Sequence, residues 1–285
     1  MPADDMAITA DAQRTNLAER IAALTDRRRI AVVPLRGVIG GAVRTADLVK
    51  TLERARDNRH IRAVVLDIAS PGGDAVASET LYLAVHHLAQ RKPVVAWIRS
   101  VGASGSYFAA CGATRILAFP AAIVGSIGVI SVRPVLTGLL RRFGAHVVVT
   151  KTGKFKDLGA PWREATEEDR AKERELVDGM FHHFTSAVRQ ARRFDEEALA
   201  LVTTGEVWMA DRALELGLVD ALAEEEDALK EAQQLADLPR RKTVKLQPRR
   251  SLLQRLGMPG AGMGPPGPRW LVELEGWSHI PRLRT

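Results

Sequence analysis

Two short stretches of the sequence combine glycine with hydroxyl groups in a way that could support acyl transfer. The first is Gly102-Ala103-Ser104-Gly105-Ser106, which lies between an apolar run and a string of small residues. A serine at a tight turn between a strand and a helix lies near free backbone N–H groups, which stabilise a developing alkoxide. The pattern is close to the nucleophile elbow G-x-S-x-G but lacks its last glycine. On its own it leaves open an ordinary turn whose hydroxyls bond to the main chain.

The second stretch is Ser70-Pro71-Gly72-Gly73-Asp74, which follows the apolar run Ala63–Ile68. Two adjacent glycines let the backbone approach a ligand closely and turn its N–H groups outward. Gly72 and Gly73 could therefore form an oxyanion hole for a tetrahedral acyl intermediate. An ordinary glycine-rich turn is the alternative at this position.

A base for such a serine is easier to find among the lysines than among the histidines. None of the seven histidines lies in a glycine-rich or hydroxyl-rich context, and Asp178 and His182 have metal-ligand spacing without a third ligand. The segment Lys151–Asp157 holds three lysines and does not match a phosphate-binding loop. A lysine acts as a general base only when neutral, which burial near hydroxyl donors favours. The segment from Ser100 to Val132 has many hydroxyls and a single charge, Arg115, and could supply that environment.

Alternating strands and helices must position these stretches. Short β-branched or apolar runs predict buried strands, and the spacing of Leu81, Val85 and Leu88 predicts a helix. A longer helix is predicted from Thr166, which has capping-box spacing to Asp169, and a short amphipathic helix around Leu17–Leu24. The pattern is typical of an α/β fold with largely parallel strands. The predicted strands are Ile30–Val33, Ala63–Ile68, Val94–Ile98, Arg115–Phe119 and Val147–Thr150.

Five motifs, in order and at single-domain spacing, resemble the signal peptide peptidase A family. They are SPGGD, VGASGSYFAACGA, VGSIGV, KFKDLGAPWREATEEDR and TGEVWMADRALELGLVD, and the resemblance runs from about residue 30 to 235. It implies a ClpP/crotonase-like superhelix of repeated β-β-α units. It also implies a Ser/Lys-dyad serine endopeptidase that cleaves short apolar peptides such as remnant signal peptides.

The resemblance also implies roles for single residues. Ser104 matches the nucleophile, Lys156 the general base and Ser126 the hydroxyl that orients this lysine, and Gly72 and Gly73 match the oxyanion amides. The family's serine proteases need no metal, nucleotide or organic cofactor, bind the peptide substrate in an extended form, and assemble as homo-oligomers. In two respects the sequence departs from the family: Ser106 stands where a glycine is usual, and the N-terminal membrane anchor of bacterial members is not found.

Two alternatives remain open at this point. A crotonase-type hydratase or isomerase acting on acyl-CoA shares the fold and the oxyanion glycines, and would leave Ser104 and Lys156 without a role. A non-catalytic scaffold of the same fold is the other alternative.

Composition and charge bound these interpretations. The 285 residues are 46% hydrophobic and 26% charged with one cysteine, which is typical of a soluble globular protein without intrachain disulfides. The net charge is +7; residues 239–285 hold ten Lys/Arg and two Glu, so this tail carries +8 and the rest −1. A nearly neutral body argues against a nucleic-acid partner. We expect an extension over 1–29, a protease domain over 30–238 and a basic tail over 239–285.

The location of the protein is predicted from the same sequence. No secretory signal opens the chain, and Ile116–Val132 is too short and too interrupted for a membrane span. A buried strand followed by a loop is expected there instead. We therefore expect a cytoplasmic protein. Its tail, with Leu252, Leu253, Leu256, Trp270 and Trp277, could contact anionic lipid at the inner membrane face.

Overall fold

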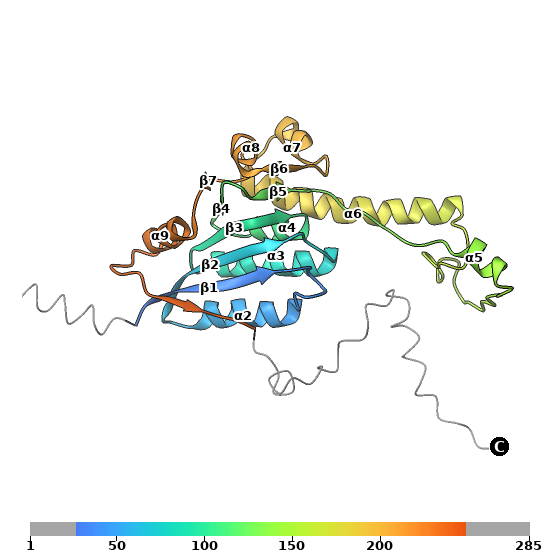
Figure 1. Ribbon diagram of the computed structural model, residues 1–285, viewed down its shortest axis with the longest axis horizontal. Helices are drawn as coiled ribbons and strands as arrows, with labels where there is room; N and C mark the ends of the chain where they lie inside the picture. Colours follow the sequence, from blue (N-terminus) through green and yellow to red (C-terminus); the bar gives the residue numbers. More distant parts are fainter. Residues whose placement is uncertain (1–26, 249–285) are drawn as a thin grey trace, which may run out of the picture. The chain divides into compact units, whose positions relative to one another are not determined.

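The computed structural model describes residues 27–248, which form an eight-stranded sheet with helices on both faces (Figure 1). The path through the sheet is β6-β5-β3-β2-β1-β8, and β4 and β7 branch from β3. The strands are β1 (Arg29–Arg36), β2 (Ile61–Ser70), β3 (Val94–Ala103), β4 (Arg115–Ala118), β5 (Ile123–Gly125), β6 (Val207–Met209), β7 (Ala221–Leu222) and β8 (Thr243–Lys245). The helices are α2 (Thr45–Asp57), α3 (Ala75–Ala89), α4 (Gly105–Ala110), α5 (Thr137–Arg142), α6 (Glu167–Arg192), α7 (Glu196–Val202), α8 (Ala210–Glu215) and α9 (Glu225–Leu235).

The central strands are apolar almost throughout because helices cover both of their faces. In β2 only Arg62 is exposed, and β2 pairs in parallel with β1 on one side and β3 on the other. The strand β3 forks along its length: Val95–Ile98 pair with β4, and Val101–Ala103 pair with β5. The predicted α/β class with largely parallel strands and flanking helices is confirmed.

Two apolar clusters hold the helices to the sheet. The larger cluster includes Leu52, Leu81, Ile98 and Tyr107 and lies under α2, α3, α4 and the end of α6. The smaller cluster includes Val65 and Trp97 on the opposite face, where α9 packs. Each fully buried aliphatic or aromatic side chain stabilises the fold by roughly 1.5–3 kcal/mol. The strands that position the candidate site are therefore held from both sides.

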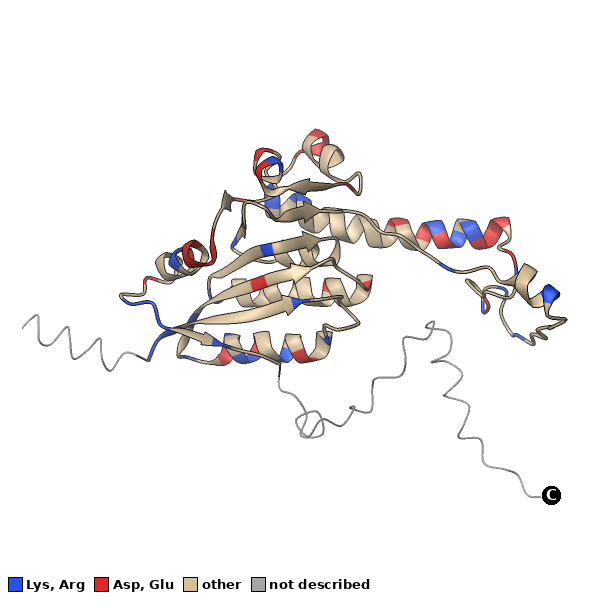
Figure 2. Cartoon of the chain, viewed as in Figure 1, with Lys and Arg blue, Asp and Glu red and all other residues tan. Residues whose placement is uncertain are grey.

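The helix α6 has two halves of different character. Thr166 caps it by accepting a hydrogen bond from Asp169 N, and the Asp169 carboxylate accepts one from Thr166 N, as its capping-box spacing predicts. Near its other end Phe184 and Val188 are buried, and the Phe184 ring stacks on Phe108 of α4. The first half instead carries alternating acidic and basic side chains (Figure 2). Only the second half of α6 belongs to the core.

We call residues 128–166, between the end of β5 and the start of α6, the arm. It contains α5 and turn-rich loops, and Figure 1 shows α5 at the start of α6, away from the sheet. Large apolar side chains of the arm face solvent: Ile130 is 85% exposed, Val132 84%, Phe143 77% and Val148 91%. Such a concentration of exposed apolar groups is typical of surfaces that contact another molecule or another segment.

The arm is also where the sequence-based predictions failed. The predicted strand Val147–Thr150 is wrong, because these residues form an exposed loop. A β-branched run signals that something must cover it, and residues 27–248 do not supply the cover here. The expectation of a buried strand followed by a loop over Ile116–Val132 is confirmed by β4 and by the loop after Gly125, with the short strand β5 in addition.

Other expectations have mixed outcomes. The helix predicted around Leu81–Leu88 is confirmed as α3, and β8 adds a strand beyond the predicted boundary at Leu238 by pairing with β1. The helix around Leu17–Leu24 and the tail residues Leu252–Trp277 lie outside the described residues. Within residues 27–248, no helix has both the length and the apolar character to cross a membrane.

Candidate active site

The turn between β3 and α4 presents Ser104 in a strained conformation. Its backbone has φ 52° and ψ −125°, a region that a non-glycine residue enters at a cost of roughly 1–3 kcal/mol. Two hydrogen bonds hold it there: Ser104 N donates to Gly125 O at 2.8 Å, and Phe108 N donates to Ser104 O at 2.9 Å. The side chain is half-buried at the C-terminal end of the central strand. This is the strand-turn-helix geometry that the elbow-like motif predicts.

The glycine turn between β2 and α3 lies directly against Ser104. Gly72 has φ +95°, and a Cβ on it would lie 2.8 Å from Ser104 Cβ and 2.7 Å from Gly105 N. Gly73 has φ +154°, and a Cβ on it would lie 2.1 Å from Ile39 O. No side chain fits at either position, so the two turns meet through bare backbone.

Two serines brace these turns against each other. Ser106 is fully buried, and its Oγ donates to Ser70 O at 2.7 Å and to Ala103 O at 2.9 Å. Ser70 Oγ in turn accepts a hydrogen bond from Gly72 N at 3.1 Å. The serine that departs from the family's usual glycine therefore ties the β2 turn to the β3 turn. Its hydroxyl bonds to the main chain, as the alternative interpretation of these hydroxyls expects.

Ser126 belongs to the same cluster of turns. It follows β5, whose Gly125 pairs with Ala103 of β3, so Ser126 and Ser104 leave neighbouring parallel strands. Its backbone is also left-handed, at φ 52°, and its N–H donates to Glu206 O at 2.5 Å. The structure therefore brings Ser104, Gly72, Gly73 and Ser126 to one edge of the sheet.

Lys156 is not part of this cluster within a single chain. It lies in an exposed turn-rich loop of the arm, where its N–H donates to Gly153 O at 3.2 Å. Figure 1 shows this part of the chain beside α5, apart from the junction of β3 and α4. The expectation that the hydroxyl-rich segment surrounds this lysine is therefore wrong within a single chain.

The sequence-based predictions did not include the Gly105 N–H, which the structure places beside the Ser104 turn. Gly105 N lies against Gly72, and a Cβ on Gly105 would be 3.5 Å from Gly73 N, so the amides of Gly73 and Gly105 flank the Ser104 turn together. The position directly after the nucleophile in the elbow motif is the signal that could have found it.

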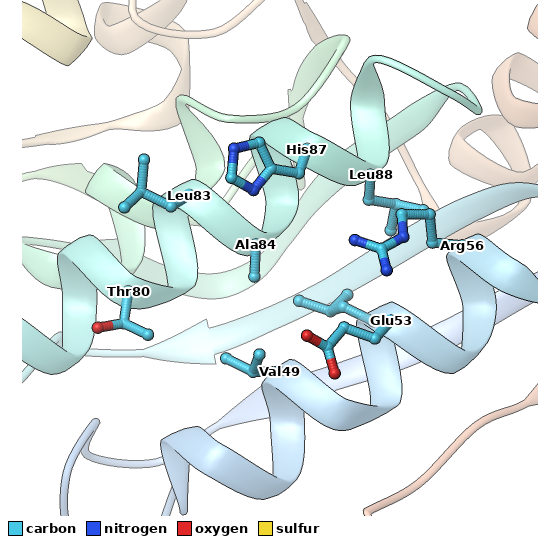
Figure 3. A pocket seen from close by; sticks show the side chains of 9 residues that line it. Val49, Glu53, Arg56, Thr80, Leu83, Ala84, His87 and Leu88 are labelled. Carbon is cyan, nitrogen blue, oxygen red and sulfur yellow. The ribbon is translucent and has the colours of Figure 1, made fainter.

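Two hollows formed by the described residues lie away from this cluster of turns. A groove of about 190 Å³ separates α2 from α3 and is lined mainly by aliphatic side chains with Glu53, Arg56 and His87 (Figure 3). A second hollow of about 320 Å³ is lined by Tyr82 and Cys111, and burial raises the pKa of this thiol to about 12. A thiol that stays protonated is not a nucleophile at neutral pH. Residues 27–248 contain no group of three or more His, Cys, Asp or Glu side chains placed to hold a metal ion.

Comparison with known proteins gives consistent matches. Residues 86–239 match peptidase family S49. A protein designated a protease from Methanocaldococcus jannaschii is 34% identical over 67% of this chain and 61% of its own length. A protein with the same designation from Synechocystis is 34% identical over 74% of this chain and 76% of its own length. The chloroplastic serine protease SPPA of Arabidopsis thaliana is 31% identical over 73% of this chain, which spans 31% of that protein.

Proposed function

The chain belongs to peptidase family S49, a family of serine-type peptidases, and we propose that it is an endopeptidase with Ser104 as its nucleophile. The observation that carries the proposal is the strained Ser104 turn packed against Gly72 and Gly73. A strained turn of this kind holds a hydroxyl clear of the main chain and beside unpaired N–H groups.

The proposed reaction is acyl transfer in two stages. Ser104 Oγ attacks the scissile carbonyl carbon while neutral Lys156 Nζ takes its proton, giving a tetrahedral intermediate. When the C–N bond breaks, Lys156 returns the proton to the leaving amine and an acyl-enzyme remains. A water molecule then attacks the acyl carbon while Lys156 takes its proton; as the ester bond to Ser104 breaks, Lys156 returns this proton to Ser104 Oγ and the carboxylic acid is released. Ser126 is assigned to orient Lys156 by hydrogen bonding.

The oxyanion is assigned to backbone N–H groups at the meeting point of the two turns. Gly72 and Gly73 are the pair that the sequence predicts, but Gly72 N already donates to Ser70 Oγ. Gly73 N and Gly105 lie close to each other beside the Ser104 turn. We therefore favour these two amides as the donors, with Gly72 providing the space for their approach.

We propose that Lys156 acts on Ser104 of a neighbouring copy in a homo-oligomer. Two observations support this: the loops beside α5, to which the arm's Lys156 belongs, lie apart from the junction of β3 and α4 in the same chain (Figure 1), and the arm exposes Ile130, Phe143 and Val148. Contact of the arm with a second copy would bury these side chains and bring the lysine to a hydroxyl-rich edge. Burial beside hydroxyl donors favours the neutral lysine that the reaction needs.

The proposed substrate is a short apolar peptide such as a remnant signal peptide, bound in extended form. The segment that follows Ser126 exposes the apolar side chain of Val132. Apolar side chains along an extended backbone suit a peptide that adds to a strand edge and places its own apolar groups alongside.

A fluorophosphonate probe with a quenched apolar peptide tests the proposal. The wild-type chain should be labelled and should cleave the peptide, and Ser104→Ala should abolish both. Ser100→Ala, which removes an exposed hydroxyl of the same strand, should leave both unchanged. Labelling that survives Ser104→Ala would refute the nucleophile. Absence of labelling with tight CoA binding would support a crotonase-type enzyme, and absence of both would support a scaffold.

A further inference from the structure

A network of charged side chains anchors the loop that bears Lys156. Arg163 donates to both carboxylate oxygens of Asp157, through Nε to Oδ2 and through Nη2 to Oδ1, each at 3.0 Å. Lys151 Nζ donates to Asp157 Oδ1 at 2.6 Å and to Lys154 O at 3.0 Å. Asp157 is thus held by two cations, one from each side of the loop.

Arg163 also connects this loop to the start of α6. Its guanidinium bonds to both oxygens of Asp169, with Nη2 to Oδ1 at 3.2 Å, and Asp169 is the capping-box residue of the helix. The same guanidinium donates to Asp157 O at 3.2 Å and to Glu164 O at 3.1 Å. A planar guanidinium can bridge two carboxylates in fixed geometry, which a lysine cannot do. Apart from local turn hydrogen bonds, the loop around Lys156 is joined to α6 only by an exposed ion pair between Lys154 and Glu168 among the described residues, so Arg163 is its partly buried link to the helix.

The network separates two neighbouring side chains of opposite charge. The Asp157 side chain is 8% exposed and faces Arg163 and Lys151, whereas Lys156 is exposed. Hydrogen bonds from Arg163 and then Lys151 lower the pKa of Asp157 to about 2, so it is ionised at neutral pH. A carboxylate free to reach a lysine favours the charged ammonium. An ammonium cannot take a proton from serine.

The other charged groups around the loop have partners of their own. Lys154 pairs with Glu168 on α6, and Arg133 pairs with Glu173 at 3.1 Å. The Glu164 carboxylate accepts a hydrogen bond from Thr137 Oγ1 at 2.9 Å. Asp157 is therefore the carboxylate adjacent to Lys156 whose release would change the surroundings of the lysine.

We infer that Arg163 is a positioning residue for Lys156: it fixes the loop to α6 and keeps Asp157 from pairing with the lysine. The inference rests on the proposed role of Lys156 as base. Because the base must be neutral, kcat/KM rises with pH up to a plateau. Loss of Arg163 frees one side of Asp157, and the midpoint of this rise moves to higher pH.

The test compares kcat/KM of full-chain variants for a quenched apolar peptide from pH 5 to 10. Arg163→Gln should raise the midpoint by about 0.5–1 pH unit, which is roughly a 3- to 10-fold loss at a fixed pH on the rising limb. Adding Asp157→Asn to Arg163→Gln should return the midpoint to the wild-type value, because the freed carboxylate is gone. The plateau value of kcat/KM should stay below that of the wild type, because the loop is still not fixed to α6. Arg163→Lys should keep the midpoint near the wild-type value, because a cation still faces Asp157. It should lower the plateau value of kcat/KM, because an ammonium cannot bridge Asp157 and Asp169 as the planar guanidinium does.

A matched control is Arg170→Gln, which removes an exposed pair with Glu167 in the same turn of α6 and should not move the midpoint. A plateau that falls in Arg163→Gln at an unchanged midpoint would mean a merely structural role and would overturn the inference. If Arg163→Gln does not fold, Lys151→Gln removes the other cation on Asp157. It should give a smaller upward shift, and no shift would refute the inference.

Lys156→Ala distinguishes a failure of Lys156 as the base from a failure of Arg163 as its positioning residue. If this variant keeps full activity, Lys156 is not the base and the proposed function fails. If it is inactive while Arg163→Gln and Lys151→Gln leave the midpoint unchanged, the proposed function stands and the inference about Arg163 fails. The pH dependence of fluorophosphonate labelling gives a second reading of the same midpoint without peptide cleavage.

Discussion

Ser104 and Lys156 lie in two regions that are built differently. The turn around Ser104 is enclosed by the sheet, α3 and α4, and its geometry depends on glycines that admit no side chain. The arm around Lys156 has exposed apolar side chains, and ion pairs hold its loop. The comparison indicates that one half of the proposed dyad is complete within the chain. The other half lies in a loop held by ion pairs, and in our proposal a second copy supplies the rest of its surroundings.

The largest expected effect concerns whether the two halves come from different copies. Ser104→Ala and Lys156→Ala should each lower activity by at least about 10³-fold, because each removes a group that acts in the bond-breaking step. When equal amounts of the two inactive variants are mixed and reassembled, about a quarter of wild-type activity should return. Each site takes its serine from one copy and its lysine from the next, and with random assembly about one site in four has both intact. Activity assays after co-refolding measure this. No recovery, with assembly intact, would place both groups in one chain.

A second experiment tests the rigidity of the enclosed half. Gly72→Ala should reduce kcat about 10²-fold or more, because a Cβ there would lie 2.8 Å from Ser104 Cβ and would displace the oxyanion amides. The free energy of unfolding should fall by roughly 1–3 kcal/mol because of the positive φ.

The matched change is Gly179→Ala in α6, where a Cβ would meet nothing within 4 Å. It should leave activity unchanged and should stabilise the chain by about 0.5–1 kcal/mol. Equal losses in both variants, measured by denaturant titration and peptide cleavage, would mean that the Ser104 turn is no more constrained than a helix surface.

A third experiment tests the surface of the arm. Val148 is 91% exposed, so Val148→Asp should not change the unfolding temperature of an isolated chain. If the arm contacts a second copy, the buried charge should weaken assembly and lower activity about tenfold or more at submicromolar protein. Light scattering and a concentration series measure both. An unchanged oligomer with unchanged activity would contradict the role of this face.

The smallest expected effect concerns pH and the loop of the arm. Asp157 has its pKa lowered from 3.8 to about 2, so the stability it contributes is present above pH 4 and is lost as pH falls through 2. Asp157→Asn should therefore lower the unfolding temperature by about 2–4 °C between pH 5 and 8. The difference should disappear near pH 2. A difference that persists there would mean that Asp157 acts through packing and not through its charge.

The contrast between the two regions also explains what could be predicted from the sequence. The glycine turn, the Ser104 turn and the cap at Thr166 depend on neighbours in the sequence, so local patterns find them. The predicted strand at Val147–Thr150 failed because a β-branched run shows only that apolar groups need covering. It does not say whether the cover comes from the same chain. The separation of Lys156 from Ser104 is a tertiary property that motif spacing does not contain.

The fork of β3 has a consequence for how the molecule opens and closes. Hydrogen bonds to β2, β4 and β5 hold the strand that ends at Ser104, so its amides can exchange with solvent chiefly through unfolding of the whole sheet. The loop of the arm can open by breaking a few side-chain contacts. Fluctuations of the arm would therefore leave the Ser104 turn intact, and an assembly that comes apart could re-form without refolding its nucleophile.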